Sequence, residues 1–488
     1  MQTIQLKDPT LLRQQAYIAG AWADADGGET VAVTNPANGR QIGTVPMCGA
    51  EETARAIAAA EIAQRAWAEV PAKERCAVLR RLNDLMLANV DDLALIMTTE
   101  QGKPMAESRG EIAYAASFIE WFAEEARRVY GDTIPAPEAD RRILALKQPV
   151  GVTAAITPWN FPAAMLTRKA GPALAAGCAM VVKPATQTPF SALAFAELAE
   201  RAGVPKGLLS VLTGSASKIG GEMTRNPVVR KLTFTGSTEV GRTLMKQSAD
   251  TIKKLSLELG GNAPFIVFDD ADVDAAVEGA MVSKYRNTGQ TCVCANRIYV
   301  QRGVLDDFTR KLVAKVEAMK VGDGTAPGVT QGPLIDAKAV EKIEEHVADA
   351  VAKGGKVLTG GKRHALGGLF FEPTVIGGAT AGMLFAREET FGPLAPIFAF
   401  DTEEEAIAAA NDTEFGLASY FYARDIGRIM RVAEALESGI VGVNTGLVST
   451  AEAPFGGVKQ SGLGREGSKY GLDDFLEVKY VCLAGVDK

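Results

Sequence analysis

The stretch "GVTAAITP" at residues 151–158 is a short run of small and β-branched residues that ends in a proline. Three similar runs follow it, namely "AMVVKP" (179–184), "LLSVLTG" (208–214) and "KLTFTGS" (231–237). Segments with a helical pattern, such as Pro189 to Ala202, separate them. Strands that alternate with helices form βαβ units, so the sequence predicts an α/β fold with a parallel sheet.

The chain on both sides of these strands fits the same fold class. Residues 51–130 carry Ala, Glu, Leu and Arg at helical spacing, which predicts helices packed on the outside of the sheet. After residue 262 the strand and helix pattern starts again, with a helix predicted over 272–288, so we expect a second α/β domain. Asp401 and Glu404 stand at capping-box spacing and predict the start of another helix.

Length, composition and charge limit the possible classes of protein. The chain has 488 residues, about three times a usual domain length, which predicts two or three domains. A net charge of −7 gives no support to nucleic-acid or membrane partners. The first twenty residues lack the features of a secretory signal, and the apolar run from Ala170 to Val182 is too short to span a bilayer. We therefore expect a cytoplasmic protein.

The few cysteines point to free thiols. Of the six, only Cys292 and Cys294 are close together, in "GQTCVCANR" (289–297), which fits a reducing compartment better than a disulfide framework. A zinc site needs more ligands than this pair, and the chain has only two histidines, His346 and His364. We expect no metal.

A catalytic cysteine needs a lowered pKa or a nearby base. His346 lies in an amphipathic stretch that predicts an exposed helix, and His364 lies in a loop, so a Cys/His hydrolase is poorly supported. In "KKLSLELGG" (253–261), strand alternation places Glu258 on the face opposite three leucines. Partial burial there raises a carboxyl pKa and suits a general base, although this stretch alone fits a surface glutamate on an edge strand better.

Two further motifs follow strands of the predicted sheet. "TPWNFP" (157–162) holds Asn160 in a turn between prolines, where its amide can donate to an oxyanion, although a plain turn asparagine fits the stretch equally well. "FTGSTEVG" (234–241) leads from a strand into a helix, and its backbone N–H groups suit a pyrophosphate. Its glycine spacing differs from G-x-G-x-x-G, so the match is weak by itself.

Each of these motifs is weakly specific alone, but seven that occur in series are strong evidence for a family. The chain resembles the aldehyde dehydrogenase superfamily from about residue 15 to residue 482, through "PWNFP", "KPA", "FTGS", "LELGG", "GQTCVCANR", "EETFGP" and "PFGGVKQSGLGREG". Within it, the chain is most similar to bacterial succinate-semialdehyde dehydrogenases. The resemblance implies a Rossmann-like dinucleotide-binding domain (1–128 and 149–257), an α/β catalytic domain (258–465) and a small β oligomerisation element (129–148 and 466–488).

The same resemblance implies a mechanism. Cys292 adds to the aldehyde, Asn160 and the Cys292 backbone N–H stabilise the oxyanion, and Glu258 activates the water that hydrolyses the thioester. Two arginines and a serine, which match Arg168, Arg286 and Ser449, are expected to bind the carboxylate of succinate semialdehyde. Glutarate semialdehyde, or another ω-carboxylated aldehyde, remains an alternative, because one methylene changes apolar binding by only about 1–3 kcal/mol.

Cofactor and partners follow from the same resemblance. The implied cofactor residues are Trp159, Lys183, Thr186, Gly236, Ser237, Leu259, Glu389 and Phe391. Related NAD-dependent enzymes often have Glu at the position of Thr186, where it repels a 2′-phosphate, so we expect NADP to be preferred with NAD possible. Two outlying alternating stretches, 129–151 and the C-terminal residues, predict edge pairing and a homodimer or homotetramer.

Other interpretations stay open at this point. Cys294 is either a small packing residue or the partner of Cys292 in a reversible disulfide that switches activity off. Transfer of the acyl group to coenzyme A instead of water is disfavoured, because relatives with that chemistry generally lack the Glu258 base. A thiol hydrolase or a non-catalytic scaffold could reuse the same fold.

Overall fold

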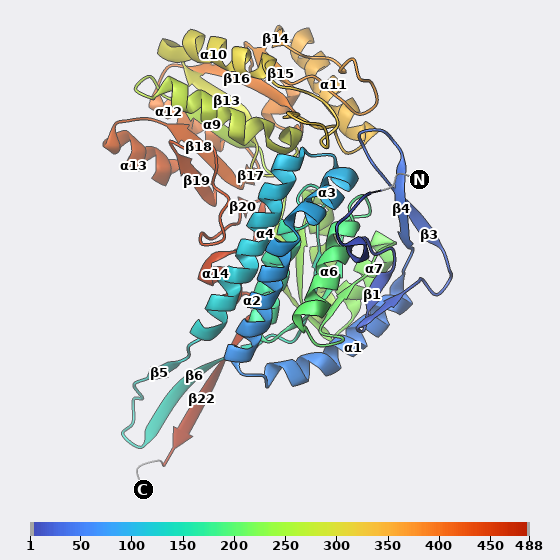
Figure 1. Ribbon diagram of the computed structural model, residues 1–488. Helices are drawn as coiled ribbons and strands as arrows, with labels where there is room; N and C mark the ends of the chain where they lie inside the picture. Colours follow the sequence, from blue (N-terminus) through green and yellow to red (C-terminus); the bar gives the residue numbers. More distant parts are fainter. Residues whose placement is uncertain (1–3, 486–488) are drawn as a thin grey trace.

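The computed structural model describes residues 4–485, which form two large sheets with helices on their faces and one small sheet that projects from the body (Figure 1). These architectures agree with the α/β class and the second α/β unit expected from the sequence.

The first large sheet has eight strands in the order β2-β1-β9-β8-β7-β10-β11-β21. Its five central strands are parallel, whereas the short strands at both ends are antiparallel to their neighbours. The bounds are β1 Ala16–Ile18, β2 Ala21–Ala23, β7 Val152–Ile156, β8 Ala179–Lys183, β9 Leu209–Val211, β10 Val229–Thr235, β11 Lys254–Glu258 and β21 Gly462–Leu463.

Helices cover both faces of this sheet, and its central strands carry apolar residues on both faces. All five residues of β8 are buried, as expected for a parallel strand between two helix layers. One continuous apolar core joins the sheet to the surrounding helices. These helices are α1 Ala50–Ala68, α2 Ala72–Ala88, α3 Val90–Gln101, α4 Met105–Glu125, α5 Ala164–Ala176, α6 Phe190–Ala202, α7 Ala216–Arg225 and α8 Thr238–Ser248.

The order of the strands reverses between β7 and β10. From β7 the chain proceeds outward through β8 and β9, then returns to place β10 on the other side of β7. In open parallel sheets, ligands bind in the crevice at such a point, beyond the carboxyl ends of the strands. Asn160 follows β7 and Ser237 follows β10, so both motifs predicted from the sequence reach this crevice.

The second large sheet has seven strands in the order β14-β15-β16-β13-β12-β18-β19, and only β14 is antiparallel to its neighbour. Separate apolar cores lie on its two faces. Its strands are β12 Ala263–Val267, β13 Ala295–Gln301, β14 Lys356–Thr359, β15 Thr374–Gly377, β16 Leu394–Phe400, β18 Ala418–Tyr422 and β19 Ile440–Val443. Its helices are α9 Val273–Tyr285, α10 Leu305–Glu317, α11 Ala337–Ala352, α12 Glu403–Asn411 and α13 Ile426–Ala435.

The projecting sheet consists of β5 (Asp132–Ile134), β6 (Arg141–Pro149) and β22 (Leu476–Ala484), with β6 in the middle. It lies at the lower left of Figure 1, away from both large sheets. Val478 and Tyr480 on the edge strand β22 are 69% and 65% exposed. Exposed apolar side chains on an edge strand suit pairing with another chain.

Three short features complete the chain. The pairs β3 (Thr30–Thr34) with β4 (Gln41–Pro46) and β17 (Phe415–Gly416) with β20 (Val458–Lys459) form small antiparallel sheets. Helix α14 (Ser468–Asp473) packs on α4 and α5, just before β22. No helix among residues 4–485 combines the length and apolarity needed to cross a membrane.

One local prediction is wrong by a residue. The N-cap of α12 is Thr402, whose hydroxyl accepts from the backbone N–H of Glu405, whereas the sequence spacing pointed to Asp401 and Glu404. Glu405 in turn accepts from the backbone N–H of Asp401. Several acidic residues in succession allow more than one capping register, and the hydroxyl at 402 selects the later one.

Candidate active site

A pocket of about 270 Å³ lies where the two large sheets meet. Much of its lining comes from the segments around the carboxyl ends of β7, β10 and β11 in the first sheet and from the segment before β13 in the second. Among the residues predicted from the sequence, the lining includes Trp159, Asn160, Arg168, Gly236, Ser237, Glu258, Leu259, Arg286, Cys292, Glu389, Phe391 and Ser449. The fold thus brings together residues that are up to about 290 positions apart.

The loop before Cys292 has an unusual backbone. Asn287 and Thr288 adopt φ values of 53° and 59°, in the left-handed region that residues other than glycine rarely enter. Side-chain hydrogen bonds hold this conformation, because Asn287 receives a bond from Gln101 and donates to the carbonyl oxygen of Gln290. Backbone strain of this kind persists where surrounding contacts fix it, and it is common at active sites.

The Cys292 side chain is only partly exposed to water. Burial raises the pKa of its thiol to about 12, while the positive charge of Arg168 acts in the opposite direction. At neutral pH the sulfur therefore carries its proton in this structure. A nucleophilic role requires that the thiol lose this proton before the sulfur attacks.

Asn160 is held by its backbone as well as by its side chain. Its carbonyl oxygen accepts from Lys103 Nζ at 2.7 Å and from Asn287 Nδ2 at 3.0 Å. Its side-chain Nδ2 donates to the carbonyl oxygen of Gln290 at 3.0 Å. An amide nitrogen has two N–H groups, so one remains for a ligand in the pocket.

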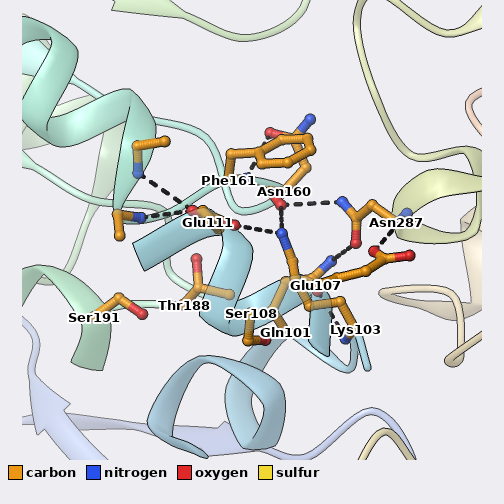
Figure 2. A network of polar contacts seen from close by, with 12 residues as sticks. Gln101, Lys103, Glu107, Ser108, Glu111, Asn160, Phe161, Thr188, Ser191 and Asn287 are labelled. Carbon is orange, nitrogen blue, oxygen red and sulfur yellow. Dashed lines mark hydrogen bonds and ion pairs between the residues drawn. The ribbon is translucent and has the colours of Figure 1, made fainter. Parts of the chain in front are cut away.

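Figure 2 shows the buried polar network around this asparagine. Lys103 Nζ also contacts Glu111 Oε2 at 2.5 Å, and Glu111 accepts from the backbone N–H groups of Ala163 and Ala164. Glu107 accepts from the backbone N–H of Asn287. The network joins α4 to the segments that carry Asn160 and Cys292, so it fixes the distance between the two sheets at the site.

Glu258 ends strand β11 and points into the pocket. Both of its carboxyl oxygens are buried and have no hydrogen-bond partner among the described residues. Burial, and next the negative charge of Glu466, raise the pKa of this carboxyl well above its usual value. An unpaired carboxyl group with a raised pKa, in the same pocket as a free thiol, has the properties of a general base.

Three residues were expected to bind a substrate carboxylate. Arg168, Arg286 and Ser449 all line the pocket. The Arg168 side chain is 1% exposed, and its Nη1 and Nη2 atoms have no partner among residues 4–485. The guanidinium carbon of Arg286 lies 5.4 Å from the centroid of the Phe161 ring. Within residues 4–485, Arg286 forms no ion pair. Guanidinium groups without an ion-pair partner in a pocket suit an anionic ligand.

Sequence reasoning missed several residues at this end of the pocket. Tyr114 and Phe455 belong to the lining, and the Tyr114 hydroxyl is buried without a partner. Glu466 forms ion pairs with Arg168 and Lys169. Phe455 and Glu466 stand in the quoted motif "PFGGVKQSGLGREG", and a charged residue between glycines was the available signal. Nothing near Tyr114 in the sequence distinguishes it from other residues of α4.

At the opposite side of the pocket, the lining suits a flat ring joined to a sugar. The rings of Trp159 and Phe391 meet edge to face, with centroids 5.6 Å apart. Glu389 is partly exposed and accepts from the backbone N–H of Gly261, and loss of contact with water raises its pKa to about 8. A Cβ at Gly260 would lie 2.9 Å from Glu389 Oε2, so glycine keeps this space open. These residues fit a nicotinamide nucleotide.

Two predicted cofactor residues lie outside the pocket lining. Lys183 is the last residue of β8, and its Nζ donates to Thr186 Oγ1 at 3.4 Å. Lys183 is buried without a carboxylate partner among residues 4–485, and burial lowers its pKa to about 8. The pair sits beyond the carboxyl end of the strand next to β7, where the far end of a dinucleotide in the pocket can reach.

Cys294 does not line the pocket. Its thiol is buried and donates to the carbonyl oxygen of Lys284 at 3.4 Å, and both it and Cys292 are free thiols in this structure. A disulfide between them therefore needs a change in the loop conformation.

The exposure expected for His346 is wrong. Its ring is fully buried, with Nδ1 3.1 Å from Thr390 Oγ1, because α11 packs this face against the core of the second sheet. His346 is not part of the pocket, so a Cys/His pair is absent from the described lining. Within residues 4–485, no three His, Cys, Asp or Glu side chains gather as a metal site would require.

Comparisons with known proteins agree along almost the whole chain. Residues 22–481 match the model of the aldehyde dehydrogenase family. The chain is 68% identical over 483 residues to the glutarate-semialdehyde dehydrogenase of Pseudomonas aeruginosa. The matched region covers 99% of this chain and 100% of that protein. It is 65% identical over 480 residues to the succinate-semialdehyde dehydrogenase GabD of Escherichia coli, whose name specifies NADP(+), with 98% and 100% coverage.

A solved structure gives the same result. The crystal structure of succinate-semialdehyde dehydrogenase from Burkholderia pseudomallei superimposes with a TM-score of 0.98 at 67% identity, over 98% of this chain and 99% of that one.

Proposed function

Since the chain belongs to the aldehyde dehydrogenase family, we propose that it oxidises succinate semialdehyde to succinate with NADP+ as the preferred cofactor. Membership confirms the family and the fold predicted from the seven motifs. As a member, the protein is an enzyme that acts on small aldehydes with a nicotinamide cofactor. The observation that carries the substrate proposal is the pair of unpaired, buried Nη atoms of Arg168 in the pocket that Cys292 also lines.

In the proposed mechanism, the Cys292 thiol loses its proton to the solvent and the sulfur bonds to the aldehyde carbon. Glu258 takes no proton in this step and acts later, on the water that attacks the thioester. The free N–H of the Asn160 amide and the backbone N–H of Cys292 donate to the oxygen that becomes negative. Donors fixed in advance stabilise such an oxyanion without reorganisation during the reaction.

Trp159, Glu389 and Phe391 would hold a nicotinamide, which would supply the acceptor for the hydride that leaves the former aldehyde carbon. Loss of that hydride leaves the acyl group on the Cys292 sulfur as a thioester. Glu258 takes a proton from a water molecule, and the resulting hydroxide attacks the thioester carbon. The C–S bond breaks, which releases the acid and returns the thiolate. Covalent capture divides one difficult oxidation into two easier steps.

The cofactor preference rests on Lys183 and Thr186. A protonated Lys183 can pair with a 2′-phosphate, and Thr186 offers a hydroxyl where a carboxylate would repel that group. NAD remains possible, because the residues proposed to hold the nicotinamide are not the ones proposed to meet the 2′-phosphate. Gly236, Ser237 and Leu259 are proposed to follow the dinucleotide between the two ends.

Glutarate semialdehyde is the second candidate substrate. It is favoured by the 68% identity to a protein of that name, and it differs from succinate semialdehyde by one methylene. Both molecules present an aldehyde to Cys292 and a carboxylate to Arg168, Arg286 and Ser449, so the chemistry is the same for both.

Assembly and location complete the proposal. The domain ranges expected from the sequence are retained, although β21 of the catalytic range pairs with β11 in the first sheet. The projecting sheet is proposed to join two or four copies of the chain through β22. Six free thiols suit the reducing environment of the cytoplasm.

The substrate proposal is tested with kcat/KM for succinate semialdehyde, glutarate semialdehyde and butanal, followed by the appearance of NADPH. Wild-type enzyme should prefer the two carboxylated aldehydes. Arg168→Ala should lower their kcat/KM by about 30-fold or more, because removing one partner of a buried charge pair costs about 2 kcal/mol or more. Equal use of butanal by the wild-type enzyme would exclude the proposal.

A further inference from the structure

The guanidinium group of Arg168 is fixed on one edge and one face. Its Nε donates to Glu466 Oε2 at 2.5 Å, and its central carbon lies 4.0 Å from the centroid of the Phe455 ring. The edge formed by Nη1 and Nη2 is buried without a hydrogen-bond partner among residues 4–485. A planar guanidinium binds a carboxylate through two parallel N–H groups, and this edge offers them.

The two residues that hold the guanidinium are joined by their backbones. Phe455 N–H donates to the Glu466 carbonyl oxygen, and Glu466 N–H donates to the Phe455 carbonyl oxygen, both at 2.7 Å. These two reciprocal hydrogen bonds form an antiparallel bridge. The carboxylate on the edge and the ring on the face are therefore placed by one structural unit.

Glu466 holds two buried cations, and Glu258 acts on the same two by charge without a hydrogen bond to either. The other oxygen of Glu466 accepts from Lys169 Nζ and, at 3.1 Å, from Thr233 Oγ1. Lys169 Nζ also donates to Thr235 Oγ1 at 2.7 Å. One carboxylate thus serves two buried basic side chains, Arg168 and Lys169. Buried cations require pairing, so a carboxylate ligand at the free edge of Arg168 completes the cluster.

We propose that Glu466 is a positioning residue for recognition of carboxylated aldehydes, acting through Arg168 without lining the pocket itself. Glu466 occupies the Nε edge, so the Nη1–Nη2 edge is the one presented to the substrate carboxylate. Phe455 prevents rotation of the guanidinium plane, and the unpaired Tyr114 hydroxyl supplies a further donor at the same end. This inference rests on the proposed function and adds the source of its selectivity.

The experiment compares succinate semialdehyde with butanal, which has the same chain length without the carboxylate. The quantity measured is the ratio of their kcat/KM values in the full-length enzyme with NADP+. Glu466→Gln keeps the size of the side chain and removes its charge. Glu452→Gln is the matched control, because Glu452 is an exposed glutamate on the same segment.

The expected result is that Glu466→Gln lowers the ratio at least tenfold, mainly by raising KM for succinate semialdehyde, while Glu452→Gln keeps the wild-type ratio. Inhibition by succinate should weaken in parallel. A second role of Glu466 through the charge on Glu258 would lower kcat for both aldehydes alike. An unchanged ratio, whatever happens to kcat, overturns the inference.

Two further results are informative. If Glu466→Gln does not fold, Phe455→Leu decides, because it removes the ring from the guanidinium face and keeps every charge. A tenfold fall in its ratio supports the positioning role, and a wild-type ratio contradicts it. A wild-type enzyme without preference between the two aldehydes would overturn the proposed function itself, whereas a preference retained in both variants overturns only the inference.

Discussion

Glu258 and Cys292 face the same pocket from different sheets. Glu258 ends β11 of the eight-stranded sheet, whereas Cys292 precedes β13 of the seven-stranded sheet. The two elements touch closely, since a Cβ at Gly261 would lie 2.7 Å from the Cys292 carbonyl oxygen. A base and a nucleophile on separate rigid sheets keep a constant separation, and small changes between the sheets would change the reaction rate.

Asn160→Ala should lower kcat by ~10²- to 10³-fold, because one oxyanion donor is lost. Its backbone bonds to Lys103 and Asn287 do not depend on the side chain, so the pocket should remain intact. Steady-state kinetics with succinate semialdehyde measure the effect, and binding of NADP+ serves as the control. A loss below threefold would remove Asn160 from the mechanism.

Hydrolysis of the acyl-enzyme should speed up as pH rises. Glu258 acts as a base only when ionised, and burial raises its pKa above the ordinary value of 4.5, so the rate should fall as pH drops through the raised pKa. Single-turnover experiments across the pH range measure this limb. Glu258→Gln should lack it, and a variant that keeps the wild-type pH profile would show that another group is the base.

The same carboxyl group should affect stability in the opposite direction. The pKa of Glu258 is higher in the folded than in the unfolded state. Its favourable contribution to the free energy of unfolding is therefore fully present below about pH 4.5 and is lost as pH rises through the folded pKa. Glu258→Gln has no charge to bury, so above that pKa its melting temperature should exceed that of the wild-type enzyme. Thermal melts of both proteins at acidic and alkaline pH test this, and a lower alkaline value for the variant would contradict it.

Preference for NADP over NAD should decrease above about pH 8. The pKa of Lys183 is lowered by burial to about 8, so the free enzyme loses the charge that pairs with a 2′-phosphate as pH rises through that value. KM for each cofactor between pH 7 and pH 9 measures the preference. Lys183→Arg stays charged and should give a flat profile, so a pH-dependent preference in that variant would rule out Lys183 as the titrating group.

Thr186→Glu should reverse the cofactor preference. A carboxylate beside the 2′-phosphate introduces repulsion of several kcal/mol, whereas the ribose hydroxyls of NAD can donate to it. We expect kcat/KM with NADP to fall at least tenfold and kcat/KM with NAD to be kept or improved. Thr186→Val separates loss of the hydroxyl from gain of charge. Preserved use of NADP by the glutamate variant would place its phosphate elsewhere.

How much of this site the sequence could predict depends on the range of the interactions. Strand alternation around Glu258 and the prolines around Asn160 are local patterns, and they were enough to single out two residues that line the pocket. Glu466 acts on Arg168 across 298 positions, a distance in sequence at which no local pattern carries information. The buried bond from Lys103 to the Asn160 backbone was missed for the same reason.

His346 shows the opposite error. Charged neighbours on α11 made its face of the helix resemble a solvent-facing one. The segment that carries Thr390 covers that face in the fold, and the imidazole finds a hydroxyl partner there. Amphipathic spacing predicts which residues share a face, whereas the packing partner decides whether that face is buried.

Oxidation tests the role of Cys294. If a disulfide with Cys292 forms, hydrogen peroxide should inactivate the wild-type enzyme and dithiothreitol should restore it. The loop must first move the Cys294 thiol away from the Lys284 carbonyl oxygen, so inactivation should be slow. Cys294→Ala should lose the recovery by dithiothreitol. Equal recovery in both proteins would assign Cys294 a packing role only.

The covalent step is tested most directly by trapping the acyl group. Glu258→Gln enzyme is mixed with succinate semialdehyde and NADP+, and the intact protein and its peptides are measured by mass spectrometry. The account predicts a mass increase of one succinyl group on the peptide that contains Cys292, with one equivalent of NADPH formed and little free succinate. It would be contradicted by NADPH formation without that adduct, or by the same adduct when Cys292 is also replaced by serine.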